Sequence, residues 1–196
     1  LEGALYGLIL VSLLFLFVTL HELGHSLVAR RHGVSVRDIT LLPIGGVARI
    51  EGELINPAQE FWMALAGPAV NIVLAAALGA VALPILGWHA LGGWSVLLDR
   101  LTGLGFEKLL VDLLIANVGL AIFNLLPAFP LDGGRVLRAF LASRMGELNA
   151  TRIAVRVGQG LALLLGLAGF VGGGVNLNLI ALFIFSGGQQ EWRGTQ

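Results

Sequence analysis

The sequence contains no cysteine. Disulfide bonds and thiolate ligands are therefore excluded, and any metal ion would be held by His, Asp or Glu side chains. Charge is also scarce, because Asp, Glu, Lys and Arg make up 12% of the 196 residues, whereas a soluble domain carries about 25%. The 12 basic residues are balanced by 12 acidic ones, so the chain lacks the basic surface of a nucleic-acid-binding protein. We expect no nucleic-acid partner.

Long apolar runs make up much of the chain instead. Hydrophobic residues account for 57% of the sequence, and the run from Gly3 to Leu20 has no charged residue. A run of this length can cross the hydrocarbon core of a bilayer as a helix. The composition therefore predicts an all-α polytopic membrane protein with a short amphipathic helix at about 135–144 and about five transmembrane helices, at 3–31, 61–86, 109–126, 153–170 and 175–185.

The segment at residues 34–53 differs from the spans on either side of it. Val, Ile and Thr are frequent there, around turn residues in the stretch 43–46, and this pattern is typical of a β-hairpin. We expect a small membrane-associated β-hairpin or sheet at the membrane edge, with a plain connecting loop as the alternative. Asn56 then predicts the start of the second helix, because it can cap a helix whose first residue is Pro57.

The basic residues are unevenly divided between the two sides of the membrane. Ten of the twelve follow the first, third or fifth span, whereas Arg100 and Lys108 follow the second. Cytoplasmic loops are rich in Arg and Lys, so the ten residues mark the cytoplasmic side. The first span is therefore expected to end at the cytoplasmic face.

A HExxH motif lies near the cytoplasmic end of the first span, from His21 to His25. Residues four apart share one face of a helix, so the two histidines can ligate one metal ion, and Glu22 lies close enough to act on a water molecule bound there. Ionisable side chains are costly to bury in lipid. This cost argues against a purely structural role for the motif.

A catalytic zinc site needs a third protein ligand. Asp112 lies at the outer end of the third span, on the opposite side from His21, whereas Asp132 follows the cytoplasmic end. The loop before Asp132 contains two prolines and is followed by two glycines, so it can turn back into the helix bundle. Topology therefore favours Asp132, and we expect one Zn²⁺ per chain, held by His21, His25 and Asp132.

Two amide side chains in the spans could act beside this centre. Asn71 follows a Gly-Pro pair in the second span, and Asn124 lies at the end of the third. Either could donate a hydrogen bond to the oxyanion that forms when a peptide carbonyl is attacked, with Glu22 as the general base. For Asn71 taken alone, a packing role beside the helix kink at Pro68 is the simpler interpretation.

Together these motifs resemble the site-2 protease family, the intramembrane zinc metalloproteases of peptidase family M50. HELGH ends the first span, AGPAVN lies in the second and NLLPAFPLDGG follows the third, while LLPIGGVARIE resembles the family's membrane-associated β segment. The resemblance implies that the two histidines and Asp132 ligate zinc and that Glu22 is the general base. It also implies that Asn124 and Asn71 contact the substrate.

The resemblance further implies an enzyme, a zinc metalloendopeptidase that cleaves membrane-anchored proteins in or near their transmembrane segments, as in regulated intramembrane proteolysis. Its substrates would be anchored transcription factors or anti-sigma factors, and its location the plasma membrane of a prokaryote. Residues 1–196 would form one metalloprotease domain, with a catalytic core at about 4–138 and additional helices at about 151–188. Since the sequence opens with Leu1 rather than Met, we expect a fragment of a longer chain.

Two other functions fit parts of the pattern. A membrane transporter could use intramembrane His, Asp and Asn residues, and would not need zinc. A zinc-binding but inactive scaffold could hold membrane partners together, although it would have no use for Glu22 as a base beside the metal.

Overall fold

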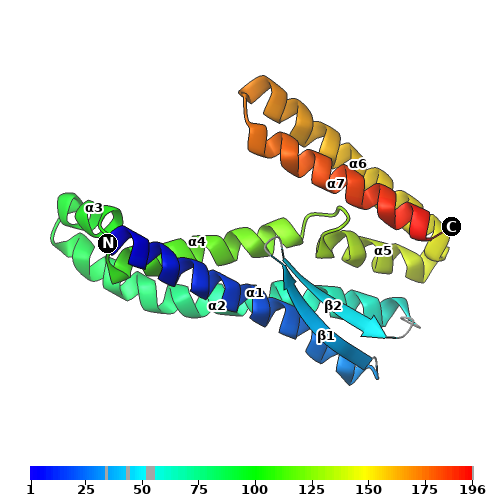
Figure 1. Ribbon diagram of the computed structural model, residues 1–196, viewed down its shortest axis with the longest axis horizontal. Coiled ribbons are helices and arrows are strands. Elements are labelled where there is room, and N and C mark those ends of the chain that lie inside the picture. The colour runs from blue at the N-terminus through cyan, green and yellow to red at the C-terminus, as the bar shows by residue number, and fades with distance from the viewer. Residues whose placement is uncertain (34, 43–44, 52–55, 196) are drawn as a thin grey trace.

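The computed structural model describes residues 1–33, 35–42, 45–51 and 56–195. Helices predominate, and one pair of strands follows the first helix (Figure 1). The elements, in chain order, are α1 (Glu2–Arg31), β1 (Ser35–Leu42), β2 (Gly45–Glu51), α2 (Pro57–Leu91), α3 (Trp94–Thr102), α4 (Phe106–Asn124), α5 (Asp132–Met145), α6 (Glu147–Gly172) and α7 (Val175–Gly194).

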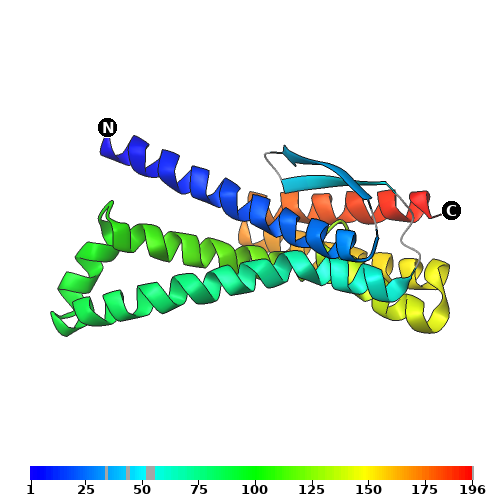
Figure 2. The same cartoon turned by 90° about the horizontal axis from the view of Figure 1, so that it is seen from below.

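Helices α1, α2 and α4 pack against one another and form one part of the molecule (Figures 1 and 2). Helix α1 approaches α2 closely at Gly24. A Cβ atom there would lie 2.9 Å from the carbonyl oxygen of Ala66 and 2.8 Å from a methyl group of Val70. Glycine therefore lets the backbones of the two helices approach, as small residues do between membrane helices.

The second part of the molecule is the pair α6 and α7, which lie side by side along their lengths (Figure 1). They are joined by a tight turn in which Gly173 has φ = 68°, a left-handed conformation that glycine adopts without strain. The pair packs on α5 and on the loop between α4 and α5. Helix α5 also packs on α2, so α5 and this loop together link the two parts.

Strands β1 and β2 pair with each other in antiparallel fashion. Both strands contact α1. The register runs from Ser35 opposite Glu51 to Leu42 opposite Gly45, with one irregularity between Val36 and Asp38. The turn expected at residues 43–44 lies outside the described residues. Both strands lie at the end of the molecule that holds the carboxyl end of α1 (Figures 1 and 2).

The predicted fold class is wrong in its five membrane spans. Within the described residues, three helices are long and apolar enough to cross a bilayer, at Glu2–Arg31, Pro57–His89 and Glu147–Gly172. Helix α4 begins with three charged residues in its first two turns, and α7 contains two asparagines, two glutamines and a glutamate. Such residues are costly in hydrocarbon, so neither α4 nor α7 has the composition of a membrane-crossing helix.

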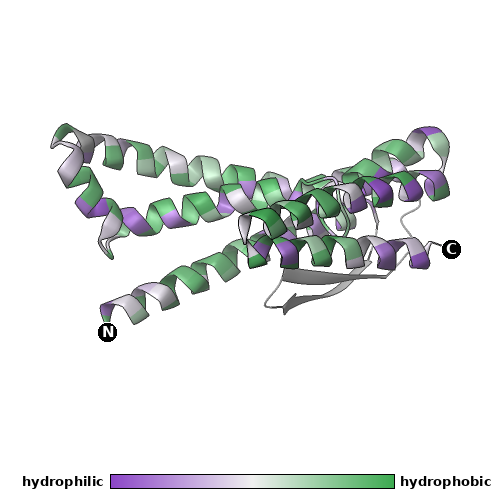
Figure 3. Cartoon of the chain, turned by 90° about the horizontal axis from the view of Figure 1, so that it is seen from above, coloured by the Kyte–Doolittle hydropathy of each residue, from purple (hydrophilic) through white to green (hydrophobic). Residues whose placement is uncertain are grey.

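Hydropathy along the molecule agrees with a membrane protein. Hydrophobic residues cover the middle lengths of the long helices, while hydrophilic residues gather towards the C-terminal end and around the start of α4 (Figure 3). Many large apolar side chains on α1 and α2 are exposed, including Leu8, Phe15, Ile72 and Val73. Lipid is the solvent that stabilises such a surface.

Candidate metal centre

His21 and His25 lie one helical turn apart near the carboxyl end of α1, and both point to the same face. Their side chains are buried, with 4% and 7% of their surface exposed. The Nε2 atoms of the two rings are 3.1 Å apart. The HExxH spacing therefore brings two potential metal-ligating nitrogens to one point.

The loop between α4 and α5 brings Asp132 to these histidines. Its Oδ2 atom lies 3.2 Å from Nε2 of His21 and 3.2 Å from Nε2 of His25. Asp132 is the first residue of α5, so the turn preceding that helix decides where the carboxylate lies. Asp112, the other acid considered from the sequence, instead accepts hydrogen bonds from Tyr6 and Lys108.

The three side chains fit a zinc ion. Ligands held at about 2.0–2.1 Å by a tetrahedral ion are separated from each other by about 3.3 Å. The observed separations of 3.1 and 3.2 Å among the three donor atoms match that spacing. Two imidazole nitrogens and one carboxylate oxygen are also a donor set that catalytic zinc uses, with a fourth position left for water or substrate.

Helix α2 forms one wall of the centre through Gly67. A Cβ atom at this position would lie 2.6 Å from Nε2 of His21 and 2.6 Å from Cε1 of His25. Real Cβ atoms do not approach other atoms so closely, so only glycine leaves room for the two rings. Gly67 was not among the site residues predicted from the sequence, although its place in the Gly-Pro pair of the second span was a usable signal.

The Met63 carbonyl of α2 fixes the protonation of one ring. Nδ1 of His25 lies 2.7 Å from the Met63 oxygen, which can only accept a hydrogen bond. Nδ1 therefore carries the proton and Nε2 keeps the lone pair that a metal needs. A backbone carbonyl has no signature in the sequence, so this contact could not be predicted.

Several polar atoms around the centre are buried without a hydrogen-bond partner among the described residues. They are Nδ1 of His21 and both amide atoms of Asn71, whose side chain is fully buried. Buried polar groups are nearly always paired, so such atoms indicate a bound water or ligand. Asn71 lies one turn beyond Gly67 on α2 and therefore faces the same side of the helix.

Two further predicted site residues, Glu22 and Asn124, lie close in sequence to residues of the metal centre. Glu22 follows His21 on α1, is half-buried, and its charge acts on His25. Asn124 is the last residue of α4 and is half-buried at the start of the loop to Asp132. The structure brings His21, His25 and Asp132 together. Among the described residues, no hydrogen bond joins the Asn71 amide to these three side chains.

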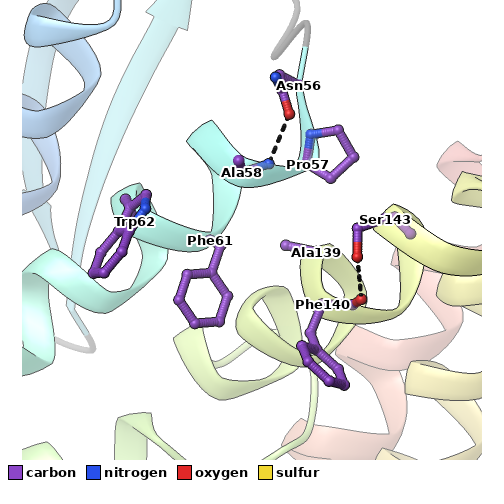
Figure 4. A pocket seen from close by; sticks show the side chains of 9 residues that line it. Asn56, Pro57, Ala58, Phe61, Trp62, Ala139, Phe140 and Ser143 are labelled. Carbon is purple, nitrogen blue, oxygen red and sulfur yellow. Dashed lines mark hydrogen bonds between the residues drawn. The ribbon is translucent and has the colours of Figure 1, made fainter.

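A hollow of about 650 Å³ lies elsewhere, between the first turns of α2 and helix α5. Figure 4 shows Phe61 and Trp62 of α2 and Phe140 of α5 around it. Two of its polar side chains are already bonded, because Asn56 accepts from the Ala58 amide and Ser143 donates to the Phe140 carbonyl. None of the metal-centre residues lines this hollow, so it is separate from the centre.

Comparison with known proteins identifies the family. The model of peptidase family M50 matches residues 9–102 and 91–165. The chain belongs to peptidase family M50. The resemblance seen in its motifs is thereby confirmed.

Named members of this family are similar over most of the chain. Zinc metalloprotease MJ0392 of Methanocaldococcus jannaschii is 39% identical over 192 residues, 98% of this chain and 52% of that protein. Putative zinc metalloprotease Rip3 of Mycobacterium tuberculosis is 40% identical over 183 residues, 87% of this chain and 42% of that protein. The chain thus spans about half the length of the curated relatives it matches.

A solved structure agrees with the sequence comparison. The site-2 protease from Methanocaldococcus jannaschii superposes with a TM-score of 0.64 at 32% identity, covering 97% of this chain and 88% of that one. M50 relatives are named as zinc metalloproteases, and the three side chains of the centre suit that ion. The zinc cofactor expected from the sequence is therefore confirmed for the family to which the chain belongs.

Proposed function

We propose that this chain is an intramembrane zinc metalloprotease domain that hydrolyses peptide bonds in or near the transmembrane segments of membrane-anchored proteins. The observation that carries the proposal is the meeting of His21, His25 and Asp132, with donor atoms 3.1–3.2 Å apart, on helices that expose apolar side chains. Burying ionisable side chains in lipid costs free energy, so a cluster of them in a membrane protein usually marks a functional site. The family relationship supports the same reading.

His21, His25 and Asp132 would hold the ion through Nε2, Nε2 and Oδ2. When bound, zinc polarises a carbonyl and lowers the pKa of a coordinated water to about 7. Asp132 supplies negative charge to the site, and the Met63 carbonyl keeps the His25 ring in the ligating tautomer. Gly67 keeps the space between the rings open.

Glu22 would serve as the general base. Its position beside His21 lets it accept the proton of the attacking water and return that proton to the leaving amine. Asn71 and Asn124 would bind the substrate backbone or stabilise the oxyanion, since amide N–H groups donate well to developing negative charge. The buried Asn71 amide has no hydrogen-bond partner among the residues that the structure describes, which supports such a role.

We further propose that residues 1–196 act as one domain, in the plasma membrane of a prokaryote, with the metal centre nearer the cytoplasm. Arg30 and Arg31 lie in the last turn of α1, just beyond His25, and basic residues at this end of the helix support this orientation. The substrates would be anchored regulators such as transcription factors or anti-sigma factors, released by regulated intramembrane proteolysis.

The deciding experiment compares three variants of the purified chain in detergent. Glu22→Gln should keep one zinc per chain but lower cleavage of a single-span substrate by about 10²–10⁴-fold. Asp132→Asn should lose zinc, whereas Asp112→Asn, the matched carboxylate at the other end of the molecule, should keep both zinc and activity. Zinc is measured by atomic emission and cleavage by gel assay.

Three results would contradict the proposal. Full activity in Asp132→Asn would exclude that residue as a ligand. Zinc binding without cleavage by the wild type would favour an inactive scaffold. A wild-type chain that holds no zinc would favour a transporter.

A further inference from the structure

The residues that lead into Asp132 are buried against the α6–α7 pair. Ala128 and Leu131 have 0% and 5% of their surface exposed. They form one apolar cluster with Ala162 of α6 and Ile184 of α7. The chain therefore reaches the metal centre through a segment whose position is set by α6 and α7, although neither helix contributes a predicted ligand.

Two glycines bring these helices into contact with the backbone of that segment. A Cβ atom on Gly158 of α6 would lie 3.1 Å from Cα of Ala128. One on Gly187 of α7 would lie 2.9 Å from the backbone nitrogen of Pro130. Neither neighbour is the free end of a flexible side chain, so a larger residue at either position would push the segment itself.

Hydrogen bonds between charged residues connect α7 to α5 and α2. Arg138 of α5 donates from Nε to Oε1 of Glu60 on α2, at 3.0 Å, and from Nη1 to Oε1 of Glu191 on α7. Burial alone would lower the pKa of Arg138, but the two carboxylates outweigh this and raise it, so the guanidinium stays charged. One partly buried cation thus joins α2, α5 and α7.

The guanidinium also reaches the loop. Its central carbon lies 5.3 Å from the centre of the Phe129 ring, within range of a cation–π interaction. Phe129 is 2% exposed and packs with Ala154 and Val155 of α6. Arg138 therefore contacts the loop before Asp132 as well as the helix that begins at Asp132.

We propose that α6 and α7 position the metal-binding carboxylate, with Gly158, Gly187, Arg138 and Glu191 as positioning residues. The inference rests on the proposed metal centre and deepens it. Gly158 and Gly187 set where the backbone from Ala128 to Pro130 lies. Glu191, through Arg138, holds α5 and therefore the direction of its first residue, Asp132. Metal affinity then depends on two helices that do not touch the ion.

The test measures binding of Co²⁺ to the full chain in detergent after zinc has been removed. Visible absorption of bound Co²⁺ reports coordination geometry, and competition with a chelator gives affinity. Gly158→Ala and Gly187→Ala are compared with Gly160→Ala on α6 and Gly194→Ala on α7, whose added Cβ atoms would meet nothing within 4 Å. Glu191→Gln removes the negative charge that pairs with Arg138, with little change in side-chain shape.

We expect Gly158→Ala, Gly187→Ala and Glu191→Gln to bind Co²⁺ about tenfold more weakly, with an altered spectrum, because residues behind a ligand commonly change metal affinity by 10–100-fold. The two control variants should match the wild type. Saturating zinc should restore kcat in the weakened variants, which a general loss of folded protein would not allow.

Unchanged affinity and spectrum in all three variants, with the wild type binding and cleaving normally, would overturn this inference alone. If a glycine variant fails to fold, Glu191→Gln decides the matter by itself, since it introduces no steric conflict. A wild-type chain that binds no Co²⁺ would overturn the proposed metal centre and this inference with it.

Discussion

The two imidazoles of α1 are held differently. His25 donates from Nδ1 to the Met63 carbonyl, whereas Nδ1 of His21 is buried without a partner among the described residues. A metal-ligating histidine normally donates its second N–H to an acceptor. Within the described residues, only His25 of the two rings therefore has its second nitrogen fixed by a protein acceptor.

Gly67 provides the sharpest prediction for a single residue. Gly67→Ala places a methyl group 2.6 Å from Nε2 of His21, so the rings must separate. We expect zinc affinity to fall by about 10–100-fold, as for other changes directly behind a ligand. Zinc per chain after dialysis against a chelator measures the effect.

Gly79→Ala on the same helix is the matched control, because its added Cβ atom would meet nothing within 4 Å. It should keep wild-type zinc affinity. Equal affinity in the two variants would mean that α2 does not limit the space around the rings.

At this scale the sequence predicted residues that act through their own atoms. The spacing of His21 and His25 predicted a shared face, and topology selected Asp132 over Asp112; the structure brings those three side chains together. Their roles as ligands stay a prediction until zinc is measured. Gly67 and the Met63 carbonyl were not predicted. Gly67 acts by lacking a side chain, and Met63 acts through a backbone carbonyl that every residue has.

Among the elements, α1 and α2 determine the width of the metal centre. Gly24 lets α1 approach α2 at Ala66, one residue before the glycine that faces the histidines. The backbone contact and the centre thus lie at the same level of the helix pair. Any side chain that separates these helices is expected to lengthen the bond between His25 and Met63.

Gly24→Val tests this arrangement. The larger side chain overlaps the Ala66 carbonyl, so we expect a loss of about 1–3 kcal/mol of stability, as is usual for an overpacked contact, together with weaker zinc binding. Thermal unfolding in detergent and zinc content are measured in parallel.

Gly7→Val on the same helix should leave both quantities unchanged, because a Cβ atom at Gly7 would meet nothing within 4 Å. A Gly24→Val protein as stable and as rich in zinc as the control would show that α1 tolerates displacement here.

The helices were predicted best where local chemistry marks their ends. The first span was expected at 3–31 and α1 is Glu2–Arg31; the cap at Asn56 and Pro57 marked the start of α2. Other ends were misjudged. Helix α2 continues past Gly87 to Leu91, and α5 begins at Asp132 rather than at Arg135. Glycine weakens a helix without ending it, and packing against neighbours decides the rest.

For the whole molecule, the sequence predicted a membrane protein of the M50 family but overestimated its spans. Apolar residues in α4 and α7 suggested membrane crossing, whereas each of these helices carries an acidic side chain that bonds to another helix. Asp112 bonds Tyr6 of α1, and Glu191 bonds Arg138 of α5. A sequence pattern cannot distinguish a polar residue facing a neighbouring helix from one facing lipid, because that difference arises only in the assembled bundle.

The positions of the three donor side chains have a thermodynamic consequence. More than a hundred residues of chain separate His25 from Asp132, and their side chains meet at one point. Holding them there closes a long loop, and the entropy lost in closing it grows with the logarithm of its length. An ion bound only by the folded chain acts as a reversible cross-link, so its removal should lower the unfolding temperature. Scanning calorimetry with and without chelator measures the shift, which Asp132→Asn should abolish.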